Sequence, residues 1–212
     1  MFTKDKSLIS SSVTGCFPDM DSLYSTIPRE ARLHMERVAG YGETLYRYML
    51  RKDAQLVSCE MGGEVERYSK RIFQYHDIGR HYIPVSIVNK AGSLTDEEYQ
   101  IVKNHTINAE KAIKSIYHAP FPDSVMKQLH DVAVFHHERY DGKGYPYGLR
   151  GTQIPFGARI CAVVDTYDGI TSWKPYKRQT TKREAIEIIK NEAGSQFDPY
   201  IVDMFCSCAV FM

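Results

Sequence analysis

Apolar residues recur every three or four positions over most of this chain, which is the period of an amphipathic helix. The pattern begins after Pro28, a residue suited to the first turn of a helix. It predicts helices that begin near Pro28, Val65, Thr95, Asp123, Pro155, Thr181 and Asp198. No stretch alternates convincingly as a half-buried strand does, so we predict an all-α chain folded as a single helical bundle.

Short sequence motifs predict several boundaries of the helices, of one loop and of the domain. Thr95 and Thr181 each precede a glutamate by three residues, the spacing of a capping box at a helix start. Glycines and a proline within residues 142–146 predict a tight loop that aims the two histidines before it. Residues 1–20 lack periodicity, so we expect a flexible N-terminal leader there and one domain over residues 21–212.

Length, charge and cysteine usage narrow the class of protein. A chain of 212 residues is large enough to fold without disulfides or a structural metal. Its 27 Lys and Arg balance 26 Asp and Glu, so no global field favours duplex nucleic acid or an anionic membrane. Five cysteines without a CxxC pair suit a reducing compartment. No signal peptide or long apolar run is evident, so we expect a soluble, cytoplasmic protein without membrane insertion.

Ionisable residues fall repeatedly on or beside the apolar faces of the predicted helices. They are Glu30, His34, His76, Asp77, His105, His136, His137 and Asp165. A single histidine on such a face is more often a hydrogen-bonded core residue than a ligand. Burying so many polar groups without partners would cost about 1–3 kcal/mol for each group. Together they favour a cluster of bound cations.

The types of ligand limit the metal and its chemistry. Imidazole and carboxylate without cysteine suit Fe, Mn or Zn. Glu30 and His34, four residues apart, share one helix face, and the two oxygens of Asp77 can bridge neighbouring ions. Two or more ions about 3.5–4 Å apart activate water and clamp a phosphoryl group, which is the chemistry of phosphoester hydrolysis. Motifs of serine hydrolases, P-loops and dinucleotide-binding folds are missing from the sequence.

Four stretches resemble the HD-GYP subgroup of HD-domain phosphohydrolases. They are His76-Asp77-Ile78-Gly79, His105, HHERYDGKGYP from His136, and DTYDGITSWKPYK from Asp165. The resemblance spans about residues 27–205. It implies an HD-type bundle that holds metals through His34, His76, Asp77, His105, His136, His137 and Asp165. Some members add a third ion through a glutamate four residues before the first histidine, and Glu30 occupies that place.

The same resemblance implies three phosphate-binding residues: Arg80, Lys174 and Lys177. Two depart from the family pattern, because Arg80 stands in place of a lysine and Lys174 in place of an arginine. Arg80 can contact phosphate through two nitrogens, but with a pKa above about 12 it is a poor proton donor. Lys174 keeps the positive charge but lacks the planar guanidinium that binds phosphate through two nitrogens, which leaves the choice of cyclic dinucleotide open. Asp168 is expected to orient a metal ligand.

We interpret the chain as a metal-dependent phosphodiesterase in which metal-bound hydroxide attacks a cyclic dinucleotide. Cyclic di-GMP is the first candidate substrate. The products are the linear dinucleotide, GMP, or both. We expect two or three divalent transition ions, Fe or Mn before others, with Asp77 and Arg80 as catalytic residues. Two alternatives stay open: hydrolysis of another cyclic dinucleotide or nucleotide, and a non-catalytic module that binds a nucleotide or partner. A homodimer and a separate sensory or signalling partner also stay open.

Overall fold

The computed structural model describes residues 17–88, 90, 92–116, 118, 121–172 and 180–211. Helices make up most of that part, and its extended pairing is limited to two isolated bridges, Phe17 with Ile116 and Ala193 with Phe197. The predicted all-α fold is therefore confirmed. No helix in the described part of the chain is long and apolar enough to cross a membrane.

Eleven α-helices are described in the residues above, with four short 3-10 turns between or after them. The α-helices are α1 (Met20–Ser25), α2 (Arg29–Lys52), α3 (Ala54–Met61), α4 (Ser69–Gln74), α5 (Val85–Val88), α6 (Asp96–Lys103), α7 (His105–Lys114), α8 (Asp123–Phe135), α9 (Phe156–Thr171), α10 (Lys182–Asn191) and α11 (Pro199–Cys208). The 3-10 turns are η1 (Gly63–Tyr68), η2 (Ile78–Tyr82), η3 (Gly151–Gln153) and η4 (Ala209–Phe211).

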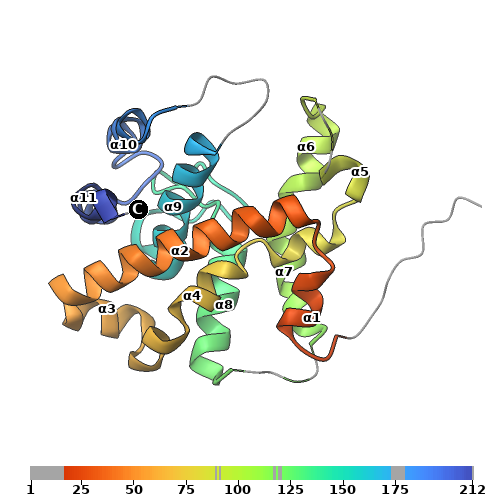
Figure 1. Cartoon of the computed structure of the whole chain (residues 1–212), viewed down its shortest axis with the longest axis horizontal. Coiled ribbons are helices and arrows are strands. Elements are labelled where there is room, and N and C mark those ends of the chain that lie inside the picture. Colours follow the sequence, from red (N-terminus) through yellow and green to blue (C-terminus); the bar gives the residue numbers. More distant parts are fainter. Residues whose placement is uncertain are drawn as a thin grey trace, which may run out of the picture.

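The long helix α2 joins the two apolar cores of the bundle and crosses the molecule in Figure 1. Its first half packs Ala31 and Met35 with α1, α7 and α8. From Val38 onward the helix belongs to the other core, where Val38 and Leu45 pack with α9 and α11. Because Met35 belongs to one core and Val38 to the other, the part of α2 around these residues lies where the two cores meet.

The fold includes residues that the sequence pattern assigned to the leader. Met20 begins α1 and is buried, and the side chain of Asp19 accepts a hydrogen bond of 2.7 Å from the backbone N–H of Ser22. The predicted boundary at residue 21 therefore lies inside α1. Residues 1–16 lie outside the described residues, so the leader itself stays a prediction.

The helix predicted from Thr95 onward is divided at Asn104 into α6 and α7. The apolar period continues across the break, so the sequence pattern did not show it. At this break the imidazole Nδ1 of His105 lies 2.6 Å from the carbonyl oxygen of Val102. That carbonyl belongs to the last turn of α6 and accepts from His105, which becomes the first residue of α7 and is buried.

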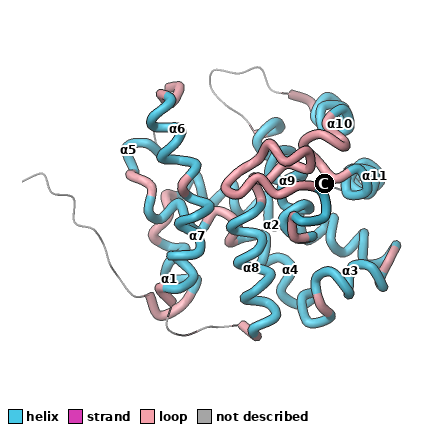
Figure 2. Tube along the Cα trace, turned by 180° about the vertical axis from the view of Figure 1, so that it is seen from behind, coloured by secondary structure: helices cyan, strands magenta, loops and turns pink. Residues whose placement is uncertain are grey.

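The chain between α8 and α9 folds as a long loop, drawn in pink beside α9 in Figure 2. Gly142 has a φ of +81°, a conformation that favours glycine. A Cβ on Gly144 would lie 2.3 Å from the backbone nitrogen of Arg139. The buried carboxylate of Glu138 accepts hydrogen bonds from the N–H groups of Tyr147 and Leu149 at 2.7 and 3.0 Å. These contacts fix the loop directly after His137.

The close contact of η2 with α7 yields a prediction about stability. A Cβ on Gly79 would lie 1.9 Å from the carbonyl oxygen of His105 and 2.5 Å from the nitrogen of Ala109. Both are backbone atoms, so Gly79→Ala should lower the free energy of unfolding by about 1–3 kcal/mol. Urea unfolding followed by circular dichroism measures this.

Gly40→Ala is the matched control for Gly79→Ala. Gly40 lies within α2, and a Cβ there would meet nothing within 4 Å. This substitution should leave stability unchanged or raise it by up to about 1 kcal/mol, because alanine favours the helix. Equal stability of Gly79→Ala and the unsubstituted protein would contradict the contact.

Candidate metal centre

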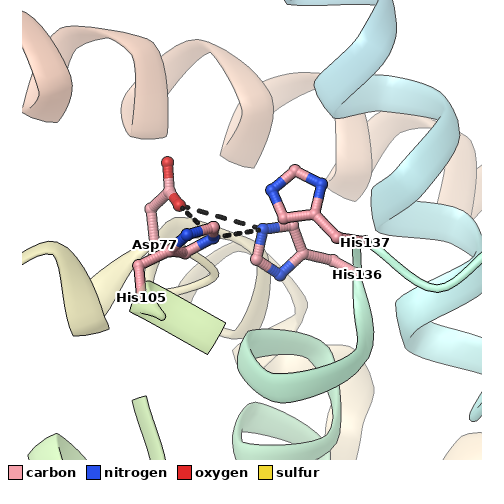
Figure 3. Close-up of side chains that lie close together, drawn as sticks. All are labelled: Asp77, His105, His136 and His137. Atoms are coloured by element: carbon pink, nitrogen blue, oxygen red, sulfur yellow. Dashed lines mark hydrogen bonds and ion pairs between the residues drawn. The ribbon is translucent and has the colours of Figure 1, made fainter. Parts of the chain in front are cut away.

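Two neighbouring groups of side chains have the composition and spacing of metal sites. The first is Asp77 with His105, His136 and His137, and the second is Asp77 with His34 and His76. Within each group the ligand atoms lie within 4.8 Å of one another. Figure 3 shows the first group, whose side chains converge from three segments of the chain. Asp77 belongs to both groups.

The two carboxylate oxygens of Asp77 face different groups. Its Oδ1 lies 3.2 Å from Nε2 of His105 and 3.8 Å from Nε2 of His136. Its Oδ2 lies 3.4 Å from Nε2 of His76 and 3.7 Å from Nε2 of His34. A carboxylate in this arrangement suits a bridge between two cations, one for each oxygen.

Backbone carbonyls hold three of the imidazoles by the nitrogen that faces away from the centre. Nδ1 of His76 lies 2.9 Å from the Phe73 oxygen, and Nδ1 of His136 lies 3.1 Å from the Val132 oxygen. His105 makes the equivalent contact described above. A carbonyl oxygen only accepts hydrogen bonds, so each Nδ1 carries the hydrogen and each Nε2 keeps a free electron pair. These are the tautomers that metal ligands require.

Buried polar atoms without hydrogen-bond partners show that the residues fit a metal. Among the described residues, Nε2 of His76 and both oxygens of Asp77 are buried and make no hydrogen bond. Nε of Arg80 lies 2.6 Å from Oδ2 of Asp77, as an ion pair without hydrogen-bond geometry. Leaving such atoms unpartnered is costly, and a cation between them would satisfy all three.

His34 is held by two aspartates of α9. Its Nε2 lies 3.1 Å from Oδ1 of Asp165, and its Nδ1 lies 2.7 Å from Oδ2 of Asp168. Arg37 donates to both oxygens of Asp168, at 2.7 Å from Nε and 3.0 Å from Nη2. Asp168 thus orients His34, as the sequence predicted. The sequence pattern did not identify Arg37 as part of the site, although its position one turn after His34 on α2 places it on the same helix face.

Burial and neighbouring charge set the protonation of the centre. Burial opposes protonation of His34, but hydrogen bonds to Asp165 and Asp168 outweigh it and raise the pKa of the imidazole to about 9. Burial lowers the pKa of His105 to about 3. For Asp77, burial favours the neutral acid, but neighbouring positive charge outweighs it and holds the pKa well below its usual range. The carboxylates are therefore ionised and His105 is neutral, as metal binding requires, whereas His34 is protonated at neutral pH and an ion that binds there must displace its proton.

Of the expected metal ligands that the structure describes, Glu30 and Asp165 belong to neither group. The side chain of Glu30 is 81% exposed, and its carboxylate lies 3.5 Å from a guanidinium nitrogen of Arg29. It lines a separate cavity of about 640 Å³ with Arg37 and Asp168. Lys174 and Lys177 lie outside the described residues. The roles of these residues stay predictions.

A cavity of about 430 Å³ opens beside the first group of ligands. Its walls include His105, His136, His137 and Asp165, and four cationic side chains: Arg80, Lys103, Arg139 and Lys143. Tyr145 also lines it, and its ring stacks on His137 with centroids 4.9 Å apart. Such a cavity suits an anionic ligand placed against the metal ligands. The sequence predicted Arg80 alone of the four cations, because the others stand in no recognised spacing.

Known proteins that are similar to this chain include phosphodiesterases of cyclic dinucleotides. The chain is 41% identical over 130 residues to a cyclic di-GMP phosphodiesterase of Pseudomonas aeruginosa, covering 61% of this chain and 30% of the relative. It is 34% identical over 180 residues to a cyclic di-GMP phosphodiesterase response regulator of Xanthomonas campestris pv. campestris, covering 84% and 46%. A 3'3'-cGAMP-specific phosphodiesterase of Vibrio cholerae is 29% identical over 178 residues, covering 83% and 31%. The chain thus spans less than half the length of each.

Solved structures share the fold. The HD domain of the L. monocytogenes phosphodiesterase PgpH, in complex with cyclic-di-AMP, aligns with a TM-score of 0.56 at 16% identity, covering 89% of this chain and 93% of that one. An HDG"Y"P protein of Bdellovibrio bacteriovorus aligns with a TM-score of 0.52 at 16% identity, covering 89% and 56%. The family model of the HD domain matches residues 74–201, more than half of the 212 residues. The chain therefore belongs to the HD domain family, as its motifs predicted.

Proposed function

We propose that this chain is a metal-dependent phosphodiesterase that hydrolyses a cyclic dinucleotide, with cyclic di-GMP as the first candidate substrate. The observation that carries the proposal is the pair of ligand groups that share Asp77 beside a cavity lined by cations. The names of the relatives support the substrate class, because several are cyclic di-GMP phosphodiesterases. A non-catalytic module would have no need of every ligand in both groups.

The donor set supports two divalent transition ions, Fe or Mn before others. The group of Asp77, His105, His136 and His137 would hold one ion, and the group of Asp77, His34 and His76 the other, with Asp165 beside it. Bound ions of this kind supply an activated water and neutralise the charge of a phosphoryl group. A third ion through Glu30 stays a proposal that rests on the family resemblance.

The protein's own residues bind and orient the phosphate. Arg80 lies between Asp77 and the cavity, so its guanidinium is placed to contact a phosphate oxygen at the metal ligands. Burial disfavours its charge, but Asp77 outweighs this effect and raises the pKa of Arg80 further above its ordinary value. Arg80 therefore holds the phosphate and keeps its proton. The leaving oxygen takes its proton from water or another group.

A second candidate substrate is the mixed cyclic dinucleotide of guanine and adenine. Similarity to 3'3'-cGAMP-specific phosphodiesterases favours it. The chemistry at the metal ligands is the same for both substrates, because both carry the same phosphodiester. Rates measured with the two cyclic dinucleotides side by side decide between them.

Loss of a buried histidine ligand tests the proposed activity. The unsubstituted protein, purified without chelator, should cleave cyclic di-GMP, and His136→Ala should lower kcat by about a thousandfold or more because one ion loses a ligand. Chromatography of the products over time measures the rate. His130→Ala is the control, because His130 is part of neither ligand group and should leave kcat unchanged. Comparable rates for His136→Ala and His130→Ala would place the active site elsewhere.

The contact of Arg37 with Asp168 predicts an effect on metal affinity. Without Arg37, the carboxylate that orients His34 loses two hydrogen bonds. Arg37→Met should therefore weaken the affinity for the ion near His34 by about ten- to a hundredfold and leave the affinity for the other ion unchanged. Competition with a chelator, followed by metal analysis, measures both affinities.

Arg47→Met is the matched control for Arg37→Met. Arg47 lies on the same helix and pairs with Glu43 on the surface. It should leave both metal affinities unchanged. Equal metal affinities in the two variants would show that Arg37 does not position His34.

A further inference from the structure

Helix α6 contributes nothing to either apolar core, although its start is well specified. None of its eight residues is buried. A complete capping box joins Thr95 and Glu98, and Lys90 forms an ion pair with the same glutamate at 2.5 Å. Figure 1 shows α6 projecting at one side of the bundle. The sequence therefore specifies a helix whose side chains serve something other than the core.

Three residues of α6 line the cavity beside the proposed metal ligands: Tyr99, Val102 and Lys103. The ammonium nitrogen of Lys103 lies 5.0 Å from the ring centroid of Tyr99 and 5.1 Å from that of Tyr145. Both distances are those of cation–π contacts. Because Tyr145 also stacks on His137, a continuous line of contacts runs from α6 to the metal ligands.

Lys103 has no acidic partner among the described residues. Lys90, Lys114 and Lys127 each lie within ion-pair distance of a carboxylate, and Lys103 does not. It is half-buried and held by two aromatic rings. A cation with this placement keeps its charge available for an anion that enters the cavity.

The other three cations that line the cavity are less suited to that role. Arg139 is paired with Asp141 through two nitrogens, at 3.1 and 2.9 Å. Lys143 is exposed. Arg80 lies against Asp77, at the metal ligands themselves. Lys103 is thus the cation best placed to bind a second anionic group away from the reacting one.

We propose that Lys103 binds the non-reacting phosphate of a cyclic dinucleotide, while the reacting phosphate lies at the metal ligands. This assignment rests on the proposed function. A cyclic dinucleotide carries two phosphodiesters in one ring, so the second stays close to the metal ligands whenever the first is cleaved. Tyr99 and Tyr145 fix the position of the ammonium group, and α6 thereby favours substrates with two phosphates over those with one.

Two substrates separate this role from a general effect on the site. Cyclic di-GMP has two phosphodiesters, and bis(4-nitrophenyl) phosphate has one. Lys103→Met keeps most of the stem and removes the charge. It should raise KM for cyclic di-GMP by about ten- to a hundredfold, the loss of one charged hydrogen bond. It should change kcat for cyclic di-GMP by less than about threefold and leave both constants for bis(4-nitrophenyl) phosphate unchanged.

Two further variants control for charge and fold. Lys103→Arg should restore KM for cyclic di-GMP to within about threefold of the original value, because it restores the charge. Lys111→Met removes a lysine that also contacts a tyrosine ring, Tyr82 at 4.5 Å, and that does not line the cavity. It should behave as the unsubstituted protein with both substrates.

The outcomes distinguish this assignment from the proposed function. An unchanged KM for cyclic di-GMP in Lys103→Met overturns the assignment and leaves the phosphodiesterase intact. An equal loss with both substrates also overturns it, because Lys103 would then act on the fold or on the metal ligands. If the unsubstituted protein cleaves bis(4-nitrophenyl) phosphate and no cyclic dinucleotide, the proposed function fails, and the assignment fails with it.

Discussion

The burial of one ionised carboxylate governs the rest of this structure. Asp77 is 1% exposed, and neither of its oxygens has a hydrogen-bond donor among the described residues. Arg80 forms an ion pair with Oδ2 at 2.6 Å, which leaves Oδ1 without a cationic partner at a depth where burying a charge is costly. Histidines from four segments point their Nε2 atoms toward its two oxygens. Cations between these groups would satisfy the electron pairs that the ion pair with Arg80 leaves free, and this links the fold to its proposed chemistry.

Helix ends position the candidate ligands because carbonyl oxygens of the last turn can accept a further hydrogen bond from a side chain. His76 follows the last turn of α4, His105 follows that of α6, and His136 follows that of α8. In each case a carbonyl from that last turn accepts the hydrogen of the imidazole Nδ1. The contact adds a side-chain donor to a carbonyl that already accepts from the backbone, and it selects the tautomer of the imidazole. Local structure therefore prepares the site before any metal binds.

The sequence predicted which side chains converge better than it predicted their surroundings. Capping boxes and prolines mark helix starts with local chemistry, so Thr95 and Thr181 were recognised as caps. Histidines on apolar faces are costly without partners, so their convergence was also predictable. The break at Asn104 was not, because the apolar period runs through it. Glu30 shows a further limit: a spacing of four places it on the face of His34, but its position in the first turn leaves it exposed.

Anomalous diffraction from crystals of the protein grown with Mn²⁺ or Fe²⁺ tests the account most directly, because it locates each ion. The account predicts two peaks, one beside Oδ1 of Asp77 among His105, His136 and His137, and one beside Oδ2 near His34 and His76. Each peak should lie about 2–2.5 Å from its ligand atoms. A protein that folds as described and shows no peak at Asp77, or a single peak remote from it, would contradict the account.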